Sequence, residues 1–212
     1  MTRLALPLLA ALLLTFSGAC QSRQKTVFPA VEGVVVDVSS GTPVDEATIS
    51  GDRTDETVGV DSDGRFSMVA VKARDTSIPL PVSGVYRDSA QIRADVDGGY
   101  AYAPADFLST GDAAFAPVIL FVLGWEAPYS AAGIPESCEL TPEEAWALRF
   151  LAVDDRAAIN RLLSENDEFT FALESWIDQT LVRKLPRRCD VQMPQLTRWL
   201  DEISAAFAPL QN

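Results

Sequence analysis

The chain carries two hydrophobic periodicities, and one regular element cannot satisfy both. Apolar residues alternate with polar ones, or form short β-branched runs, between residues 30 and 124, whereas from 136 to 212 they recur every three or four residues. The first spacing places one face of a strand against a core, and the second does so for a helix. The sequence therefore predicts an α+β protein, with an N-terminal antiparallel β-sandwich at 30–124, a linker at 125–135 and a small C-terminal helical lobe at 136–212.

Helix-start signals recur in the C-terminal part. Thr141-Pro142-Glu143-Glu144 combines an N-cap hydroxyl, a proline at the first helical position and the glutamate of a capping box. Three of the four tryptophans lie on the apolar stripes that follow, which favours a packed core. Further helices are expected to begin at Asp154 or Asp155, at Asn166 or Asp167 and at Pro194, and Pro186 is expected to end the third.

Short β-branched runs separated by turn residues mark the strands of the N-terminal part. The segment Asp61-Ser62-Asp63-Gly64 lies between two such runs and predicts a hairpin of residues 57–60 with 65–71. Its spacing departs from that of a calcium-binding loop, so Asp61 and Asp63 are interpreted as turn formers, with a weak cation site as the alternative. Two prolines indicate an edge strand at Ile78–Tyr86, and the apolar run 117–123 indicates a buried central strand.

Part of this pattern points to a known family. A glycine in the first strand, a Gly-Thr-Pro-Val turn, an Ala-x-Ile second strand and an Asp-x-Asp-Gly-x-Phe turn follow one another. The matching residues are Gly33, Gly41, Pro43, Val44, Ala47, Ile49, Asp61, Asp63, Gly64 and Phe66. The stretch resembles the carboxypeptidase regulatory-like domain. That resemblance implies a transthyretin-like sandwich and no catalytic residues here, because true carboxypeptidases hold their zinc in another domain.

The first nineteen residues have the features of an export signal. Arg3 precedes the apolar run Leu4–Phe16, which is shorter than the roughly 20 residues of a membrane-spanning helix. Small residues lead from there to Cys20. The stretch resembles a bacterial lipoprotein signal peptide, although Ser17 stands where leucine is usual. The resemblance implies cleavage after residue 19 and a lipid on Cys20; a plain secretory peptide, with Cys20 a free thiol, is the alternative.

The residue after Cys20 and the net charge of the chain indicate where the protein is located and what it can bind. Gln21, in place of aspartate after the cysteine, implies by the same resemblance the periplasmic face of the outer membrane. Residues 20–29 are expected to form a tether reaching at most about 30 Å. A net charge of −13 argues against nucleic acid as a partner. Without Arg3 the charge is −14, so the lipid on Cys20, not the protein surface, is expected to hold the chain at an anionic membrane.

Two cysteines remain once Cys20 is assigned to the lipid. Cys138 and Cys189 form an even pair in an oxidising compartment, which predicts one disulfide. Two separate buried thiols and a redox pair are the alternatives. The redox alternative is weak because the chain has no C-x-x-C motif.

The one basic cluster of this acidic chain consists of Arg183, Lys184, Arg187 and Arg188. These residues lie at an expected helix C-terminus, where cations complement the helix dipole. A docking patch for an acidic partner or a lipid phosphate is the second interpretation.

The sequence contains few residue patterns that are typical of enzymes. The chain has no histidine, which excludes Ser-His-Asp, Cys-His and His-ligated metal sites, and it has no nucleotide-binding motif. We expect a non-catalytic envelope lipoprotein without cofactor or metal, acting as a protein-interaction or assembly module for an envelope protein. One alternative is a glycan- or peptidoglycan-binding module with Tyr100 and Tyr102 as exposed rings. A hydrolase with a carboxylate pair is the other.

Overall fold

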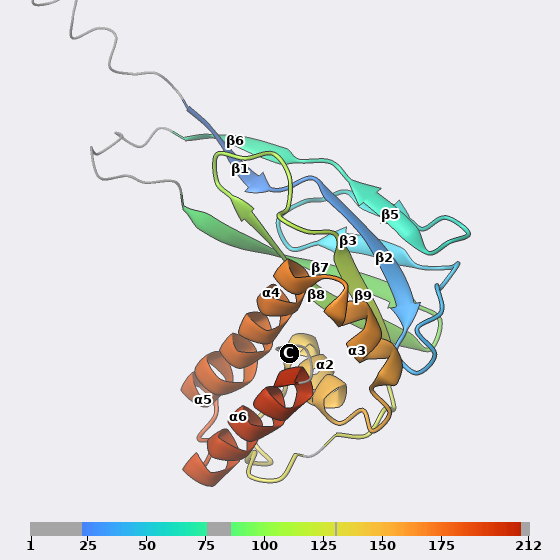
Figure 1. The fold of residues 1–212 in the computed structure, drawn as a ribbon. Helices are drawn as coiled ribbons and strands as arrows, with labels where there is room; N and C mark the ends of the chain where they lie inside the picture. The colour runs from blue at the N-terminus through green and yellow to red at the C-terminus, as the bar shows by residue number, and fades with distance from the viewer. Residues whose placement is uncertain (1–22, 76–85, 130, 209–212) are drawn as a thin grey trace, which may run out of the picture.

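A computed structural model describes residues 23–75, 86–129 and 131–208 of the chain (Figure 1). Strands come first and helices follow, so the expected α+β class is confirmed. The expected signal peptide, Cys20 and all but the last residue of the expected edge strand Ile78–Tyr86 lie outside the described residues.

The described residues form nine strands followed by helices. The strands are β1 (Arg23–Phe28), β2 (Val31–Asp37), β3 (Thr48–Gly51), β4 (Thr57–Gly59), β5 (Arg65–Met68), β6 (Val71–Asp75), β7 (Arg87–Val96), β8 (Gly99–Leu108) and β9 (Val118–Gly124). The helical segments are α2 (Pro142–Leu151), α3 (Ala157–Ser164), α4 (Asp167–Asp178), the π-helical η1 (Gln179–Lys184), α5 (Leu185–Arg188) and α6 (Met193–Phe207).

Seven strands make one sheet in the order β4-β3-β7-β8-β9-β2-β5. Neighbours are antiparallel except β2 and β9, which run parallel from Gly33↔Val118 to Asp37↔Val122. The end strands β4 and β5 approach each other, so the sheet nearly closes. Strands β1 and β6 pair separately, and we call this two-stranded sheet the β1–β6 ribbon. The run 117–123 is the buried strand β9, as expected.

The turn at residues 61–64 forms as expected, but the hairpin across it is wrong. The Asp61 carboxylate accepts the backbone N–H groups of residues 63 and 65 at 2.9 Å, and Gly64 has a φ of +69°. However, β4 pairs with β3 and β5 pairs with β2. Gly33 in β2 explains why β5 pairs with β2, because a Cβ at this position would lie 2.5 Å from the Phe66 ring. Only a glycine lets Phe66 cover β2.

The expected tether is shorter than the sequence indicated. Residues 23–28, which lie inside the range 20–29, form β1 in place of a free linker. Thr26 and Phe28 are buried, and the Thr26 N–H donates to the Ser109 carbonyl at 3.1 Å. Two buried residues at alternate positions are too few to predict a strand from the sequence. The strand forms because its backbone groups bond to those of β6.

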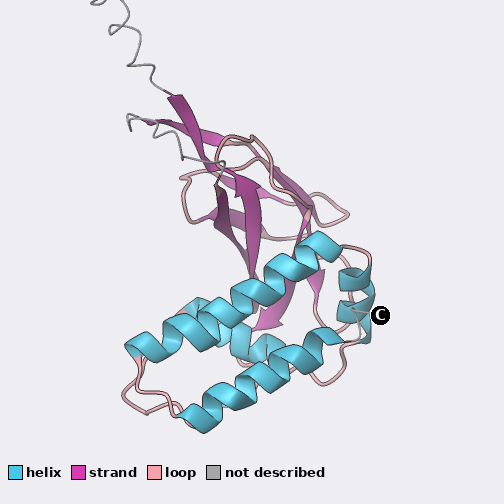
Figure 2. Ribbon diagram, turned by 60° about the vertical axis from the view of Figure 1, so that its left-hand side comes forward, coloured by secondary structure: helices cyan, strands magenta, loops and turns pink. Residues whose placement is uncertain are grey.

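The helices begin largely where their caps predict. Thr141 and Glu144 form the expected capping box at the start of α2. Segments α4, η1 and α5 follow one another without a break (Figure 2), so the expectation that Pro186 ends the third helix is wrong by two residues. The π-helical turn provides the reason. In this turn a backbone hydrogen bond spans five residues, from the Leu185 N–H to the Thr180 carbonyl. The wider turn shifts the preceding carbonyl groups, so the ring of Pro186 does not clash with them.

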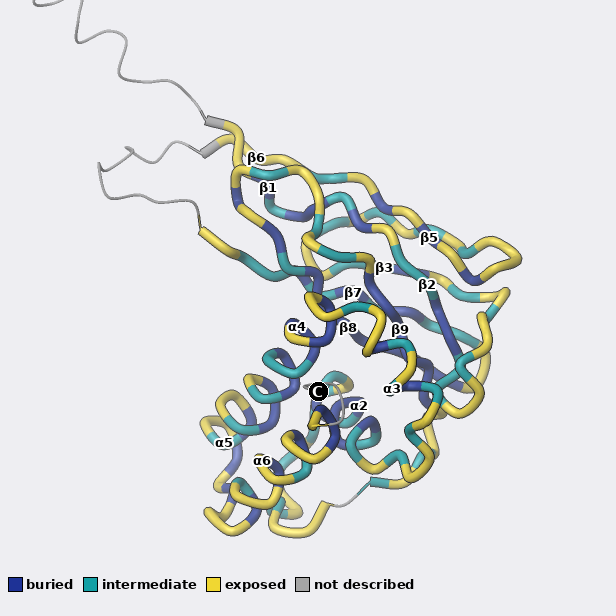
Figure 3. Tube along the Cα trace, in the orientation of Figure 1, coloured by how far each residue is buried: buried dark blue, intermediate teal, exposed yellow. Residues whose placement is uncertain are grey.

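The helices pack on the sheet and share its core. One hydrophobic cluster runs through both, and the buried stretches of the sheet and helices face each other in Figure 3. Trp146 of α2 is fully buried, and its indole N–H donates to the Phe121 carbonyl of β9 at 3.1 Å. No helix within residues 23–75, 86–129 and 131–208 is both long enough and apolar enough to cross a membrane.

Candidate functional site

A cleft opens between the start of β7 and the α4–η1 helix, with a volume of about 560 Å³. Its far wall is the loop that follows β3. The charged residues that line it are three cations and three carboxylates, namely Arg53, Arg87, Lys184, Asp52, Asp88 and Asp106. Its lining is therefore electroneutral, although the whole chain carries −13.

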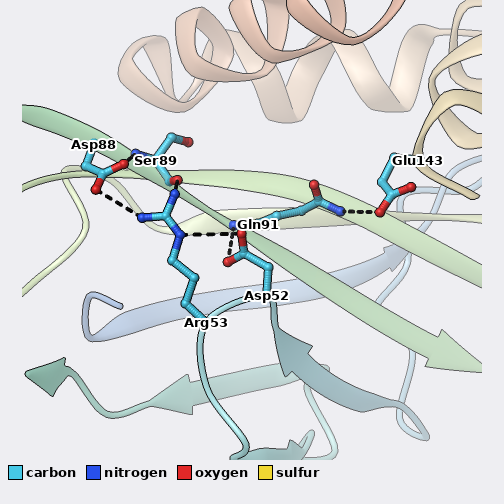
Figure 4. A network of polar contacts seen from close by, with 6 residues as sticks. All are labelled: Asp52, Arg53, Asp88, Ser89, Gln91 and Glu143. Carbon is cyan, nitrogen blue, oxygen red and sulfur yellow. Dashed lines mark hydrogen bonds and ion pairs between the residues drawn. The ribbon is translucent and has the colours of Figure 1, made fainter. Parts of the chain in front are cut away.

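Arg53 organises the sheet side of the cleft (Figure 4). Its guanidinium donates to the Asp88 carboxylate at 3.0 Å and to the Ser89 carbonyl at 2.9 Å, and it lies 3.6 Å from Asp52. The Asp52 carboxylate also accepts the backbone N–H of Gln91 at 3.0 Å, so a side chain extends the β3–β7 ladder beyond Gly51. Arg53 is thus held in a fixed position at the edge of the sheet.

The same network sets the charge of Asp88. Burial alone would raise its pKa, but the hydrogen bond from Arg53, the Ser89 backbone N–H and the charges of Arg53 and Lys25 outweigh burial and lower the pKa from 3.8. Asp88 is therefore ionised at neutral pH and has no proton to donate. Such a group suits binding better than general acid catalysis.

The Gln91 side chain connects this network to the helices. Its amide donates to Glu143 of α2 at 3.1 Å (Figure 4). Burial opposes ionisation of Glu143. Its own backbone N–H, the Thr141 hydroxyl and Gln91 outweigh burial, so the pKa of Glu143 lies below 4.5. The polar floor of the cleft is therefore tied to both layers of the fold.

Arg87 forms the outer wall. Two of its nitrogens donate to Asp106 at 3.0 and 2.8 Å, and its guanidinium lies 5.0 Å from the Phe115 ring centre and 5.7 Å from that of Phe171. Phe171 is 61% exposed. A second hollow of about 390 Å³ adjoins the cleft here, lined by both rings, Arg87, Asp167 and Glu168. The mouth of the cleft is therefore an aromatic clamp around a fixed cation.

The structure divides the predicted basic cluster. Arg183 is paired with Asp178 at 2.9 Å. Arg188 forms an ion pair with the buried carboxylate of Glu144 and donates to a backbone carbonyl at 2.7 Å, which ties α5 to α2. Lys184 lines the cleft, and Arg187 is exposed at the end of α5. The four cations thus have different contacts, and only Lys184 belongs to the candidate site.

The expectation that Tyr100 and Tyr102 are exposed is wrong. They are 1% and 3% exposed, and burial raises the pKa of Tyr102 to about 12. The Trp125 ring stacks on Tyr100 at 4.0 Å, and Arg149 donates to the Tyr100 hydroxyl at 2.7 Å. Neither tyrosine offers a free ring face to a sugar, so the residues chosen for the glycan alternative do not support it.

The two cysteines of the C-terminal part lie together. The Cα atoms of Cys138 and Cys189 are 5.6 Å apart, inside the range that a disulfide requires. The pair can therefore form a disulfide, and its oxidation in the cell remains a prediction. Cys20 lies outside the described residues.

Within the residues that the structure describes, no set of three or more cysteine or carboxylate side chains is arranged to hold a metal ion. Asp61 instead closes its own turn.

Sequence reasoning missed most of the cleft. Arg53 and Asp88 are 35 residues apart, and Arg87 meets Phe171 from a different layer of the fold. No spacing in the sequence connects these residues. The only available signal was Lys184, which belonged to the basic cluster.

Comparisons of the chain with models of known families, with curated proteins and with solved structures yield no match.

Proposed function

We propose that this chain is a non-catalytic, lipid-anchored protein of the cell envelope that acts as a protein-interaction or assembly module, with the cleft beside α4 as its contact surface. The observation that carries the proposal is the mouth of this cleft. There Phe171 is 61% exposed and Arg87 is clamped by two aromatic rings. Exposed aromatic and arginine side chains around a hollow are typical of contact surfaces between proteins.

The chemistry of the lining favours binding over catalysis. Asp88 and Asp106 are each held by an arginine, and Asp52 caps a backbone N–H. A carboxylate pair of a hydrolase needs one protonated and one free member. The pKa of Asp88 is lowered by its hydrogen bond from Arg53, so this carboxylate is not the protonated member of such a pair.

The lining also indicates the chemistry of the partner. Lys184 takes part in no ion pair among the described residues, so a partner carboxylate can bind there. The hollow beside Phe115 and Phe171 suits an apolar side chain. The partner is then an extended protein segment that presents an apolar residue near an acidic one.

A site-specific crosslink tests this proposal. A photoreactive phenylalanine analogue at position 171 is expected to yield one defined adduct in intact envelopes. The same analogue at Met193, which is 70% exposed on α6 and does not line the cleft, should not. Lys184→Glu should reduce the adduct several-fold and Arg187→Glu should leave it unchanged. Equal adducts at both positions, or no effect of Lys184→Glu, would refute the cleft as the contact surface.

The anchor is tested separately. The apolar run Leu4–Phe16 and the small residues before Cys20 support lipidation, and Gln21 supports the outer membrane as its location. Cys20→Ala should abolish labelling with palmitate and release the protein from membranes that are washed at high salt, which weakens any electrostatic contact with lipid. A wild-type chain that incorporates no labelled palmitate, with a mutant that still sediments with membranes, would contradict the anchor.

We further propose that the β-rich part belongs with the carboxypeptidase regulatory-like, transthyretin-like domains. Two residues of the family pattern have clear roles that support this assignment. Gly33 makes room for Phe66, and Gly64 occupies the positive-φ position of the turn. An experimental structure that superimposes on such a domain, with the same strand order, tests the assignment.

A further inference from the structure

The anchor leaves little chain between the membrane and the fold. Strand β1 begins at Arg23, only three residues after Cys20. Three residues span at most about 10 Å when fully extended. If Cys20 carries the lipid, as proposed above, the start of β1 is therefore held at the headgroup region, and the surface around it has to suit a bilayer.

The start of β7 and the end of β8 lie at the same end of the molecule as the start of β1 (Figure 1). Two hydrogen bonds fix this arrangement, from the Thr26 N–H to the Ser109 carbonyl at 3.1 Å and from the Ser109 N–H to the Tyr86 carbonyl at 2.9 Å. Tyr86 is 59% exposed and Leu108 is 37% exposed. An aromatic and an aliphatic side chain are thus presented beside the ribbon. Tyrosine is enriched at headgroup level in membrane proteins.

The charge of the ribbon is opposite to that of the chain. Strands β1 and β6 carry four cations and one carboxylate, whereas the whole chain carries −13. The side chains of Lys25, Lys72 and Arg74 are exposed. Lys72 is paired with Asp112 at 2.9 Å, and Arg74 takes part in no ion pair among the described residues. The ribbon is therefore cationic along its length, with Lys25 on one face and Lys72 and Arg74 on the other, and it starts where the anchor ends.

We propose that this ribbon end, defined by Lys25, Lys72, Arg74, Tyr86 and Leu108, is a second membrane contact that binds anionic lipid headgroups. The cations attract the phosphates, while Tyr86 and Leu108 lie at the headgroup level. The proposal rests on the anchored state and revises the expectation that the protein surface plays no part in membrane attachment. At about 0.1 M salt, screening limits the reach of each charge to about 10 Å. The charges next to the membrane, and not the net charge of the whole chain, therefore determine whether the surface is attracted to anionic lipid.

This contact also fixes the orientation of the protein. One flexible lipid anchor permits rotation, whereas an anchor and a surface contact a few residues away do not. Helices α5 and α6 lie at the end of the molecule away from the ribbon (Figure 1), so they face away from the bilayer. The mouth of the cleft then lies next to the bilayer contact, because Arg87 directly follows Tyr86 in the chain.

Vesicle binding without the lipid tests the contact directly. The chain from residue 20 onward with Cys20→Ala keeps every described residue and removes the anchor. It is expected to co-sediment with phosphatidylcholine vesicles that contain 30% phosphatidylglycerol, and to bind pure phosphatidylcholine vesicles at least about tenfold more weakly, because each cation near an anionic surface contributes about a fivefold factor. Raising the salt concentration should weaken the binding to the anionic vesicles.

Two charge-matched double variants make the test specific. Lys25→Glu with Arg74→Glu should reduce binding to the anionic vesicles by more than about tenfold. Arg183→Glu with Arg187→Glu changes the net charge equally at the far end of the helical layer and should leave binding near the wild-type value. Tyr86→Ser should weaken binding by a smaller factor. Circular dichroism of each variant confirms that it is folded.

Three results would overturn the proposal: no binding to anionic vesicles, equal binding to neutral ones, or equal loss in the two double variants. The outcome is independent of the anchor. If palmitate labels Cys20 but the vesicles bind no lipid-free protein, only the ribbon-end contact is wrong. If the vesicles bind but palmitate does not label the chain, only the anchor is wrong.

Discussion

Replacing Trp146 with phenylalanine tests whether the sheet and the helices unfold as one unit. Trp146 is fully buried between them, its indole N–H donates to the Phe121 carbonyl at 3.1 Å, and its ring stacks on Phe150 at 5.0 Å. Phenylalanine keeps a ring but cannot donate. The lost hydrogen bond costs about 1–3 kcal/mol, and the lost apolar contact costs about 1 kcal/mol. We therefore expect a loss of about 2–4 kcal/mol, a large part of the ~5–15 kcal/mol that stabilises a typical protein.

Urea unfolding followed by circular dichroism measures this loss, and native-state hydrogen exchange locates it. The transition should stay single, and peptides from β9 and α2 should lose protection together, because both belong to one core. Trp125→Phe is the control, since Trp125 is 43% exposed and only stacks on Tyr100; it should cost less than about 1 kcal/mol. Loss of protection in the helices alone would refute the shared core.

Three further outcomes are expected. Gly33→Ala should lower the free energy of unfolding in urea by about 1–3 kcal/mol, because a Cβ would overlap the backbone of β9 and the Phe66 ring. Gly59→Ala is the control and should be tolerated, because the nearest atom to a Cβ there is 4.0 Å away. Equal costs would contradict this explanation of the β2–β5 pairing. Reducing the Cys138–Cys189 pair should remove up to roughly 4 kcal/mol and lower the Tm in calorimetry by up to about 10 °C, and an unchanged Tm would argue against a disulfide. The pKa of Glu143 lies below 4.5, so its stabilising effect is present above that pH and is lost as the pH falls through the folded-state value; Glu143→Gln should flatten the acid side of the stability–pH curve and leave its alkaline side unchanged.

Local chemistry was readable from the sequence. The capping box at Thr141 and the turn at Asp61 both formed where expected, because each depends on side chains that bond to backbone within four residues. The strands and helices themselves follow from periodicity, which records the face that each element buries. Cys138 precedes α2 and Cys189 directly follows α5; the sequence marked the start of α2 and missed the end of α5 by two residues.

The errors arose where two distant elements meet. Tyr100 and Tyr102 alternate as a half-exposed strand does, yet nearly all of β8 is buried, since α2 and α4 cover one face and the nearly closed sheet encloses the other. Pro186 continues a helix because the preceding turn changes to π geometry. For the tyrosines the deciding contacts come from another part of the chain, whereas for Pro186 the cause is a local change of backbone geometry that no sequence pattern marks.

The sequence by itself determined the class of the fold, the approximate positions of several elements and the overall acidity of the chain. Only the tertiary structure decided where the charges lie. It pairs Arg53 with Asp88 across 35 residues, places Lys184 at a cleft and brings Lys25, Lys72 and Arg74 together on the β1–β6 ribbon of an acidic protein. The physical reason is that hydrogen bonding in turns and caps depends on separation along the chain. Electrostatic attraction and burial depend on separation in space, which the packing of the sheet and helices sets.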